Sequence, residues 1–169
     1  MSDATESRRH TARLVTVSFV LHGDDVLLIR HPADNDRFAG QWNGVGGHVE
    51  AGEDIRQAAL RELREETGVV APQLSLRGVV HESGLLGVAH VLFIFLGRAT
   101  SRDVVSLEGL ELRWQPIEKI EDLPLVHDAA FLLRRAIGAD ETFFVQETYD
   151  GGDRRMSLRI DGEHHDGDA

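Results

Sequence analysis

Residues Gly47–Val69 read GHVEAGEDIRQAALRELREETGV, and the spacing within this stretch decides the fold. Five residues separate Gly47 from Glu53, and seven more separate Glu53 from the run that begins at Arg61. Arginine and glutamate are common on any surface helix, but glycines and glutamates at such fixed distances are not expected by chance. The stretch therefore indicates a functional site built on a helix.

The helix itself is predicted over Ile55–Thr67. Asp54 suits the N-cap position, Gln57 three residues later completes a loose capping box, and Gly68 is a stop signal. At ~100° per residue, the apolar side chains share one arc that can anchor the helix on a sheet. They are Ala59, Leu60 and Leu63.

Three carboxylates share a second, narrow arc of this helix. At ~100° per residue, Glu65 and Glu66 each fall within roughly 60° of Glu62. Like charges at this spacing destabilise a helix by roughly 0.2–0.5 kcal/mol per pair. A hard divalent cation such as Mg²⁺, in contrast, binds carboxylates and joins them to substrate phosphates. The cluster therefore predicts a cation site, and Arg61 can pair with Glu65 one turn further on.

Glycines surround the start of this stretch, at Gly44, Gly46, Gly47 and Gly52. Glycine lets the backbone approach a ligand closely and adopt positive φ. The pattern matches neither the P-loop nor the dinucleotide-binding fingerprint, so the glutamates decide the interpretation.

The arrangement of Gly47, Glu53 and Arg61–Val69 resembles, without a substitution, the signature of the Nudix hydrolases. These enzymes cleave diphosphate bonds in nucleoside diphosphates linked to other groups. The resemblance implies an α/β fold, the Nudix α/β/α sandwich around a mixed β-sheet. It also implies Mg²⁺ as the cofactor, for which Mn²⁺ can substitute.

The same resemblance assigns roles to individual residues. The Gly47 carbonyl and the carboxylates of Glu62, Glu65 and Glu66 would hold the metal ion, and Arg61 would orient Glu62. We expect these residues to form the catalytic centre.

A further carboxylate is expected on a loop. Glu108 lies six residues before Trp114, a spacing at which some MutT-type Nudix enzymes carry another metal-binding glutamate. Glu111 is the competitor, and a loop glutamate is also commonly only solvated. Glu62 and Glu108 are the contenders for the base that accepts the proton from water.

The segment Arg37–Gly52, RFAGQWNGVGGHVEAG, is similar to the MutT-type nucleoside triphosphate pyrophosphohydrolases, which include enzymes that clear 8-oxo-dGTP. The similarity implies that Asn43 contacts a purine, since an amide offers both a donor and an acceptor. Asn43 is otherwise a turn residue. Asp128 stands where oxidised-purine enzymes place an acidic base-reading residue, or else it caps the second helix.

Contacts with phosphate are expected from basic residues near the same segment. His48 directly follows the glycine pair, where the MutT-type pattern commonly has lysine, and a neutral imidazole holds phosphate less firmly than an ammonium group. Arg30 and Arg37 are further candidates, although surface arginines often only increase solubility.

Three hypotheses for the function follow. The first is hydrolysis of a nucleoside triphosphate, including an oxidised purine one, to monophosphate and pyrophosphate. The second keeps the chemistry but takes ADP-ribose, a dinucleoside polyphosphate or NADH. Those subfamilies show a proline, a tyrosine or a longer motif downstream, and Ala71–Arg98 holds only Pro72 and no tyrosine. The third is a non-catalytic nucleotide-sensing module, which would tend to lose the glutamates that this chain keeps.

Apolar and alternating runs predict the remaining elements. Strands are expected at Leu14–Leu21, Val26–Arg30, Trp42–Val45, Leu74–His81, Val88–Leu96, Glu111–Trp114, Thr142–Tyr149 and Arg154–Ile160. A second helix is expected over Asp128–Ile137, and Asp150-Gly151-Gly152 predicts a hairpin. This order suits helices packed around a mixed sheet.

Length and composition limit the alternatives. The chain has 169 residues, which fits one domain at 13–160 between flexible tails at 1–12 and 161–169. It has no cysteine, which excludes the cysteine-dependent isopentenyl diphosphate isomerases that resemble Nudix enzymes. A net charge of −11 argues against a nucleic-acid-binding surface. We expect a cytoplasmic monomer or homodimer with a nucleotide substrate and with no nucleic-acid or membrane partner.

Overall fold

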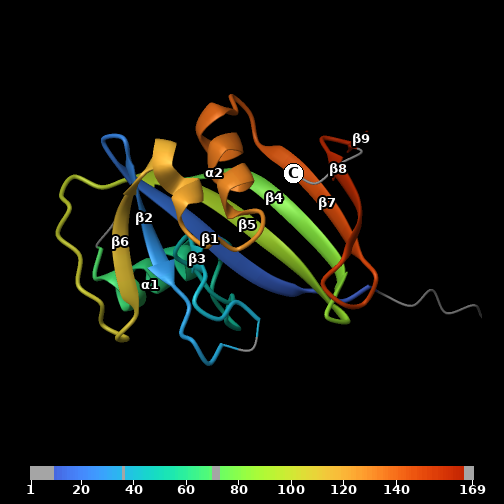
Figure 1. Ribbon diagram of the computed structural model, residues 1–169, viewed down its shortest axis with the longest axis horizontal. Coiled ribbons are helices and arrows are strands. Elements are labelled where there is room, and N and C mark those ends of the chain that lie inside the picture. The colour runs from blue at the N-terminus through green and yellow to red at the C-terminus, as the bar shows by residue number, and fades with distance from the viewer. Residues whose placement is uncertain (1–9, 36, 70–72, 166–169) are drawn as a thin grey trace, which may run out of the picture.

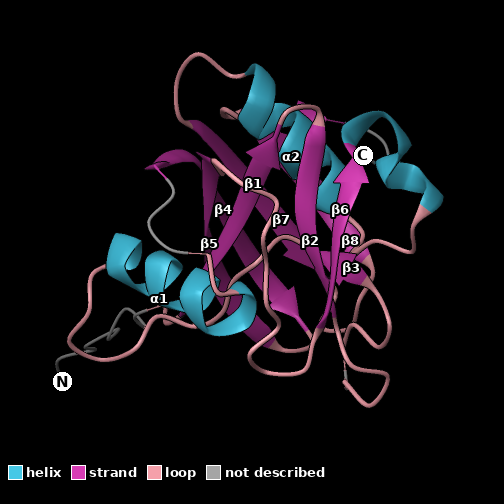
Figure 2. Cartoon of the chain, turned by 90° about the vertical axis from the view of Figure 1, so that its left-hand side faces the viewer, coloured by secondary structure: helices cyan, strands magenta, loops and turns pink. Residues whose placement is uncertain are grey.

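The computed structural model describes residues 10–35, 37–69 and 73–165, which form one sheet with helices on both faces (Figures 1 and 2). In chain order the strands are β1 Arg13–His22, β2 Asp25–Arg30, β3 Trp42–Asn43, β4 Gln73–Leu85, β5 Val88–Arg98, β6 Glu111–Pro116, β7 Phe143–Tyr149, β8 Arg155–Ile160 and β9 Glu163–His165. The helices are α1 Ile55–Thr67, the 3₁₀ helix η1 Ile117–Asp122 and α2 Ala129–Gly138.

The sheet is mixed. Its strand order is β3-β2-β1-β5-β4-β7-β8-β9, and β6 pairs with β2 beside this path. The pairs β1–β5 and β4–β7 are parallel, whereas the other pairs are antiparallel. The predicted α/β/α sandwich around a mixed sheet is therefore confirmed.

The core lies in two layers, one on each face of the sheet, because successive side chains of a strand point to opposite faces. On β1, Phe19 and Leu21 contribute to the layer under α2, together with Leu133 of that helix. Val20 points the other way and packs in the layer under α1, with Leu63. Burial of each such side chain stabilises the fold by about 1.5–3 kcal/mol.

Helix α1 begins and ends where the sequence predicts. The Asp54 carboxylate accepts a hydrogen bond from the Gln57 amide at 2.9 Å, and the Gln57 side chain accepts one from the Asp54 amide at 3.0 Å. Gly68 closes the helix in the left-handed conformation, with φ of 68°, and its N–H donates to the carbonyl of Arg64. These caps fix the rotation of α1, and with it the direction in which its glutamates point.

Several strand bounds differ from the expectation; β3, for example, ends at Asn43 and not at Val45. Strand β4 continues further than predicted, because a tight turn with positive φ at Leu86 and Gly87 lets it pair with β5 as far as Leu85 and Val88. Strand β5 begins at Val88 as predicted but continues to Arg98, where it pairs with Leu21 of β1 and Gln73 of β4. Strand β9 lies in the segment 161–169 that we expected to be a tail, because a turn at 161–162 returns the chain to pair with β8. Residues 1–9 of the expected N-terminal tail lie outside the described residues.

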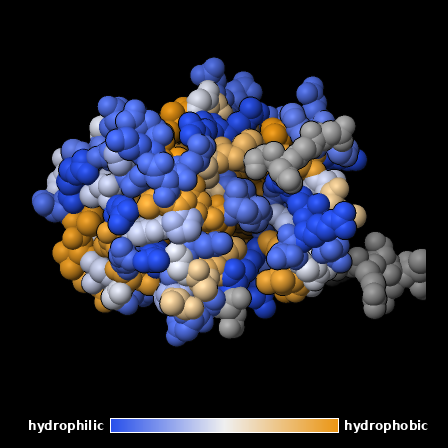
Figure 3. Space-filling view, viewed as in Figure 1, coloured by the Kyte–Doolittle hydropathy of each residue, from blue (hydrophilic) through white to orange (hydrophobic). Residues whose placement is uncertain are grey.

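The surface in the view of Figure 3 is mainly hydrophilic, with hydrophobic residues in small patches between the polar ones. This agrees with a chain in which 28% of the residues are charged. Within the described part of the chain, no helix has the length and apolar character needed to cross a membrane.

Candidate active site

A cavity of about 470 Å³ extends from the last turn of α1 to the first turn of α2, across β1, β4 and β5. Many of the residues that the sequence singled out line it. They are Arg37, Asn43, Gly47, His48, Glu66, Glu108 and Asp128. The fold thus brings together residues as far apart in the chain as Arg37 and Asp128.

Arg61, Glu62 and Glu65 do not line this cavity but lie beside its outer end, where α1 contributes Glu66 to the wall. The guanidinium of Arg61 donates to Glu53 at 2.7 and 3.1 Å, to Glu62 at 2.8 Å and to Glu65 at 3.1 Å, as well as to the carbonyl of His48 at 3.0 Å. The hydrogen bonds to the glutamates, above all those to Glu53, hold the pKa of Arg61 well above its ordinary value. The predicted pairing of Arg61 with Glu65 is confirmed, and the same guanidinium also fixes Glu62.

The glycine pair places backbone directly against the helix. A Cβ atom on Gly46 would lie 1.9 Å from the carbonyl oxygen of Thr16, and one on Gly47 would lie 2.5 Å from Oε1 of Glu62. The N–H of Gly46 donates to Oε2 of Glu66 at 3.2 Å. Only glycine allows this approach of backbone and carboxylates.

The carboxylates at this end repel one another. Burial, together with the charges of Glu62, Glu108 and Glu65, raises the pKa of Glu66 to about 8. The hydrogen bond from the N–H of Gly46 acts in the opposite direction and lowers this pKa. Burial also raises the pKa of Glu62, which Arg61 partly offsets. Buried carboxylates that raise each other's pKa form a donor set of hard oxygens, which fits a divalent cation.

Glu108 faces these glutamates from the loop before β6. It lines the cavity, and its charge acts on both Glu62 and Glu66. Its competitor Glu111 instead forms an ion pair with Arg30 at 3.0 Å. Of the two candidates, the structure therefore brings Glu108 and not Glu111 to the cluster.

A second group of carboxylates lies at the inner end of the cavity, with Glu82 and Asp128 in its wall and Glu147 next to Asp128. Glu82 on β4, Asp128 before α2 and Glu147 on β7 are all buried, with 3%, 5% and 1% of their surface exposed. Arg37 donates to Glu82 at 3.2 Å, and Arg155 donates to Glu147 at 3.0 Å. This group thus contains three carboxylates, and two arginines donate hydrogen bonds to it.

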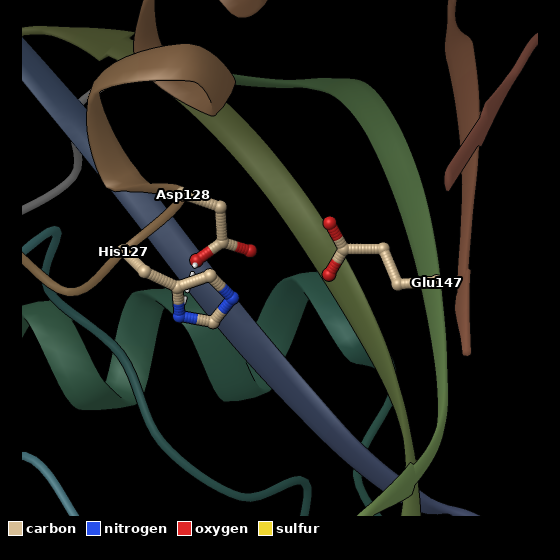
Figure 4. A group of neighbouring side chains, drawn as sticks. All are labelled: His127, Asp128 and Glu147. Carbon is tan, nitrogen blue, oxygen red and sulfur yellow. Dashed lines mark ion pairs between the residues drawn. The ribbon is translucent and has the colours of Figure 1, made fainter. Parts of the chain in front are cut away.

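Asp128 occupies the N-cap position of α2, but its side chain makes no capping hydrogen bond. Its Oδ2 atom is buried without a partner, and its Oδ1 lies 3.6 Å from Nδ1 of His127. Figure 4 shows the carboxylate of Glu147 pointing toward Asp128, with the ring of His127 beside Asp128. The geometry favours a ligand-facing role for Asp128 over helix capping.

The sequence and the fold of the chain also resemble those of known proteins. A family model described as NUDIX domain matches residues 12–136. This chain belongs to the Nudix hydrolase family.

Similar proteins support the MutT type. The chain is 28% identical to a Nudix hydrolase of Bacillus subtilis, YvcI, over 86% of this chain and 92% of that one. It is 35% identical to the oxidized purine nucleoside triphosphate hydrolase of Danio rerio, over 65% of this chain and 70% of that one. A MutT protein of Bacillus halodurans has a similar structure, with a TM-score of 0.73 and 27% identity, covering 89% of this chain and 99% of that one. The chain is a MutT-type pyrophosphohydrolase that acts on nucleotide derivatives.

Nudix hydrolases generally use a divalent metal ion, and the outer glutamates of this Nudix hydrolase offer the oxygen donors for one. Among the candidates for phosphate contacts, His48 and Arg37 line the cavity. Arg30 does not: it is bound to Glu111 and to the carbonyl of Gly40.

Sequence reasoning singled out Asp128 but missed Glu82 and Glu147, the other two inner carboxylates of this Nudix hydrolase. Glu147 stands between Val145 and Tyr149 on the buried side of β7, where the alternation of the strand calls for an apolar side chain. A buried charge within an apolar register is a signal that could have been used. Glu82 lies one residue beyond the predicted end of its strand, so its inward direction could not be inferred.

Proposed function

We propose that this Nudix hydrolase converts a nucleoside triphosphate, including an oxidised purine one, to the monophosphate and pyrophosphate. The observation that carries the proposal is that a single cavity joins two kinds of group. Glu66 and Glu108 line one part of it, suited to a polyphosphate with its metal ion, and Asn43 and Asp128 line another, suited to a purine edge.

The residues that would hold Mg²⁺, or Mn²⁺ in its place, are Glu62, Glu65, Glu66, Glu108 and the carbonyl of Gly47. When bound, the ion neutralises polyphosphate charge and increases the acidity of water. The carbonyl of Gly47 already accepts a hydrogen bond from the N–H of Thr16 at 2.8 Å, which fixes its direction.

The side chains of the chain itself perform the remaining tasks. Arg61 holds Glu62 in place at 2.8 Å, so that the carboxylate has a fixed orientation. Burial raises the pKa of Glu62, which makes it a stronger proton acceptor than an exposed glutamate. Glu62 is therefore our first choice as the general base, and Glu108 on the opposing loop is the second.

Base contacts are assigned to Asn43 and Asp128. The amide of Asn43 is held by a hydrogen bond from the N–H of Gly44 to its Oδ1 at 2.8 Å. Asp128 offers a buried oxygen that has no partner within the protein. The relative from Danio rerio, named for oxidized purine nucleoside triphosphates, supports this substrate class.

The test is product analysis after hydrolysis of dGTP with Mg²⁺ in ¹⁸O-labelled water. Attack on an internal phosphorus gives dGMP and pyrophosphate, with the label in dGMP for attack at the α position and in pyrophosphate for attack at the β position. Formation of dGDP with labelled orthophosphate would contradict the mechanism. ADP-ribose and a dinucleoside polyphosphate belong in the same screen, because faster turnover of either would contradict the triphosphate assignment.

A further inference from the structure

Buried polar atoms without a hydrogen-bond partner gather around the cavity. In the described part of the chain there are eight such side-chain atoms, and five belong to residues that line the cavity. These five are Thr16 Oγ1, His31 Nε2, Arg37 Nε, His90 Nδ1 and Asp128 Oδ2. Buried polar groups are normally paired, so this concentration marks a place where a polar ligand completes the hydrogen bonds.

Three of these residues lie next to Glu82, at the inner end of the cavity. Arg37 pairs with Glu82 at 3.2 Å, and Nδ1 of His90 lies 3.5 Å from the Glu82 carboxylate. Burial, together with the charge of Asp128, raises the pKa of Glu82 to about 7. Burial lowers the pKa of His90 to about 4, so that this histidine is neutral and adds no cation to the group.

Arg37 was expected to contact phosphate, but its surroundings indicate another role. Its guanidinium binds the buried Glu82 and lies over the ring of Phe38, 4.6 Å from the ring centre. An arginine committed to a buried carboxylate and stacked on a ring is held in one orientation. Its Nε–H remains without a partner in the cavity wall.

We propose that Arg37 and Glu82, together with Asp128, form the specificity-determining group that reads the nucleobase. Arg37 donates from Nε to a carbonyl of the base, and the carboxyl groups of Glu82 and Asp128 accept from the adjacent N–H groups. The ligand is a guanine-type edge, in which a carbonyl, a ring N–H and an amino group follow one another. This inference rests on the proposed function, and it moves Arg37 from the phosphates to the base.

The balance of donors and acceptors selects this edge. The protein offers two carboxyl groups and the buried, unpartnered Nε–H of Arg37, which match two N–H groups and one carbonyl of the base. The adenine edge offers one amino group and one accepting ring nitrogen, so above about pH 7, where Glu82 is ionised, it would leave one buried carboxylate unpaired. Site groups left unpaired by the wrong substrate are the strongest source of discrimination.

A metal ion at the inner end is the competing occupant. His127, Asp128 and Glu147 offer ligand atoms within 4.8 Å of one another. However, Oε1 of Glu147 accepts from Arg155 at 3.0 Å and Oε2 accepts from Tyr149 at 2.9 Å. Both oxygens are therefore already engaged, which favours the donor-rich base over a cation.

The experiment compares wild type with Glu82→Gln and Arg37→Lys, which keep much of the side-chain volume. We measure kcat/KM for dGTP, dATP and dCTP, and the binding of deoxyguanosine and deoxyadenosine by NMR titration. Each variant should lower kcat/KM for dGTP by about 10-fold or more, and lower that for dATP by less than about 3-fold. Binding of deoxyguanosine should weaken in parallel. Glu121→Gln is the matched control, because Glu121 and Arg134 form an exposed pair outside the cavity.

Contrary outcomes separate this inference from the proposed function. An equal loss for all three triphosphates would return Arg37 to the phosphates and overturn the inference while hydrolysis stands. Failure of the wild type to hydrolyse any triphosphate, with deoxyguanosine binding that Glu82→Gln weakens, would overturn the function and support the inference. Absence of deoxyguanosine binding, or Zn²⁺ binding that Asp128→Asn removes, would overturn the inference.

Discussion

Gly47 and Glu62 approach each other so closely that no side chain fits between them. A Cβ atom on Gly47 would lie 2.5 Å from Oε1 of Glu62 and 2.6 Å from its carboxyl carbon. The approach puts a backbone carbonyl and a carboxylate, both proposed metal ligands, on neighbouring elements that the rest of the fold holds fixed.

We expect Gly47→Ala to reduce turnover by about 100-fold, because the methyl group must displace the Glu62 carboxylate and a shift of ~1 Å at a catalytic centre costs about that much. The measurement is kcat with saturating Mg²⁺. Gly138→Ala is the control, since a Cβ atom there has no neighbour within 4 Å. Near-native turnover of Gly47→Ala would separate this glycine from the catalytic centre.

Glu62→Gln and Glu66→Gln should each lower turnover about 100-fold or more, which corresponds to about 2.7 kcal/mol of transition-state stabilisation. Both changes keep the shape of the side chain and remove one charge from the cluster. Burial and neighbouring carboxylates raise the pKa of Glu66 to about 8, so in the metal-free protein Glu66 is charged only above that pH, and there the loss of its charge relieves repulsion.

The melting temperature of the metal-free Glu62→Gln and Glu66→Gln variants should therefore stay constant or rise. Thermal unfolding followed by circular dichroism in EDTA measures this. If both variants keep near-native Mg²⁺-dependent rates, the glutamates of α1 are not the active site.

The bounds of α1 could be predicted from the sequence because its caps and its charge pattern are local. Asp54, Gln57 and Gly68 act within one turn of the helix ends, and they behave in the structure as their residue types require. The pairing of Arg61 with Glu65 is local in the same way.

The inner end of the cavity could not be predicted, because it depends on strand pairing between distant segments. Glu82 and Glu147 meet through the parallel pairing of β4 with β7, and Asp128 reaches them only because α2 packs across that part of the sheet. The partner of Arg37 was equally hidden, since Glu82 lies 45 residues away. Arrangements of this kind follow from register, which no single segment encodes.

Glu82 should make the protein less stable as the pH rises. Burial and Asp128 raise the pKa of Glu82 from 4.5 to about 7 in the folded state, so the folded protein holds a proton that the unfolded chain releases. Stability then falls with rising pH between about 5 and about 7. We expect Glu82→Gln to lack this contribution, so that wild type loses stability relative to the variant over this range.

Urea unfolding at pH 5, 6 and 7 gives the difference in unfolding free energy between wild type and Glu82→Gln. His90, whose lowered pKa has the opposite effect below about pH 6.5, is present in both proteins and largely cancels. The charged neighbours Arg37, Asp128 and Glu147 are also common to both. A difference that does not change with pH would show that Glu82 ionises normally in the fold.

Base selection must come from side chains beyond the glutamates of α1, because those handle phosphate and cannot distinguish bases. Asn43 lines the cavity with its amide held by Gly44, and Asp128 offers an unpaired buried oxygen. Loss of a buried hydrogen bond to a base edge leaves a polar group unpaired. Asn43→Ala should therefore reduce kcat/KM for purine substrates, oxidised ones above all, far more than for pyrimidine ones.

Asp128→Asn exchanges one acceptor for a donor, so it should shift the preference between dGTP and 8-oxo-dGTP without abolishing metal-dependent hydrolysis. The measurement is a set of kcat/KM values for dGTP, 8-oxo-dGTP, dATP and dCTP on wild type and both variants. Asn43 and Asp128 are not among the residues proposed to bind Mg²⁺. The ratio of kcat/KM values between substrates should therefore change more than kcat/KM for the poorest substrate. A uniform loss across all four nucleotides, or no loss at all, would place the purine pocket elsewhere.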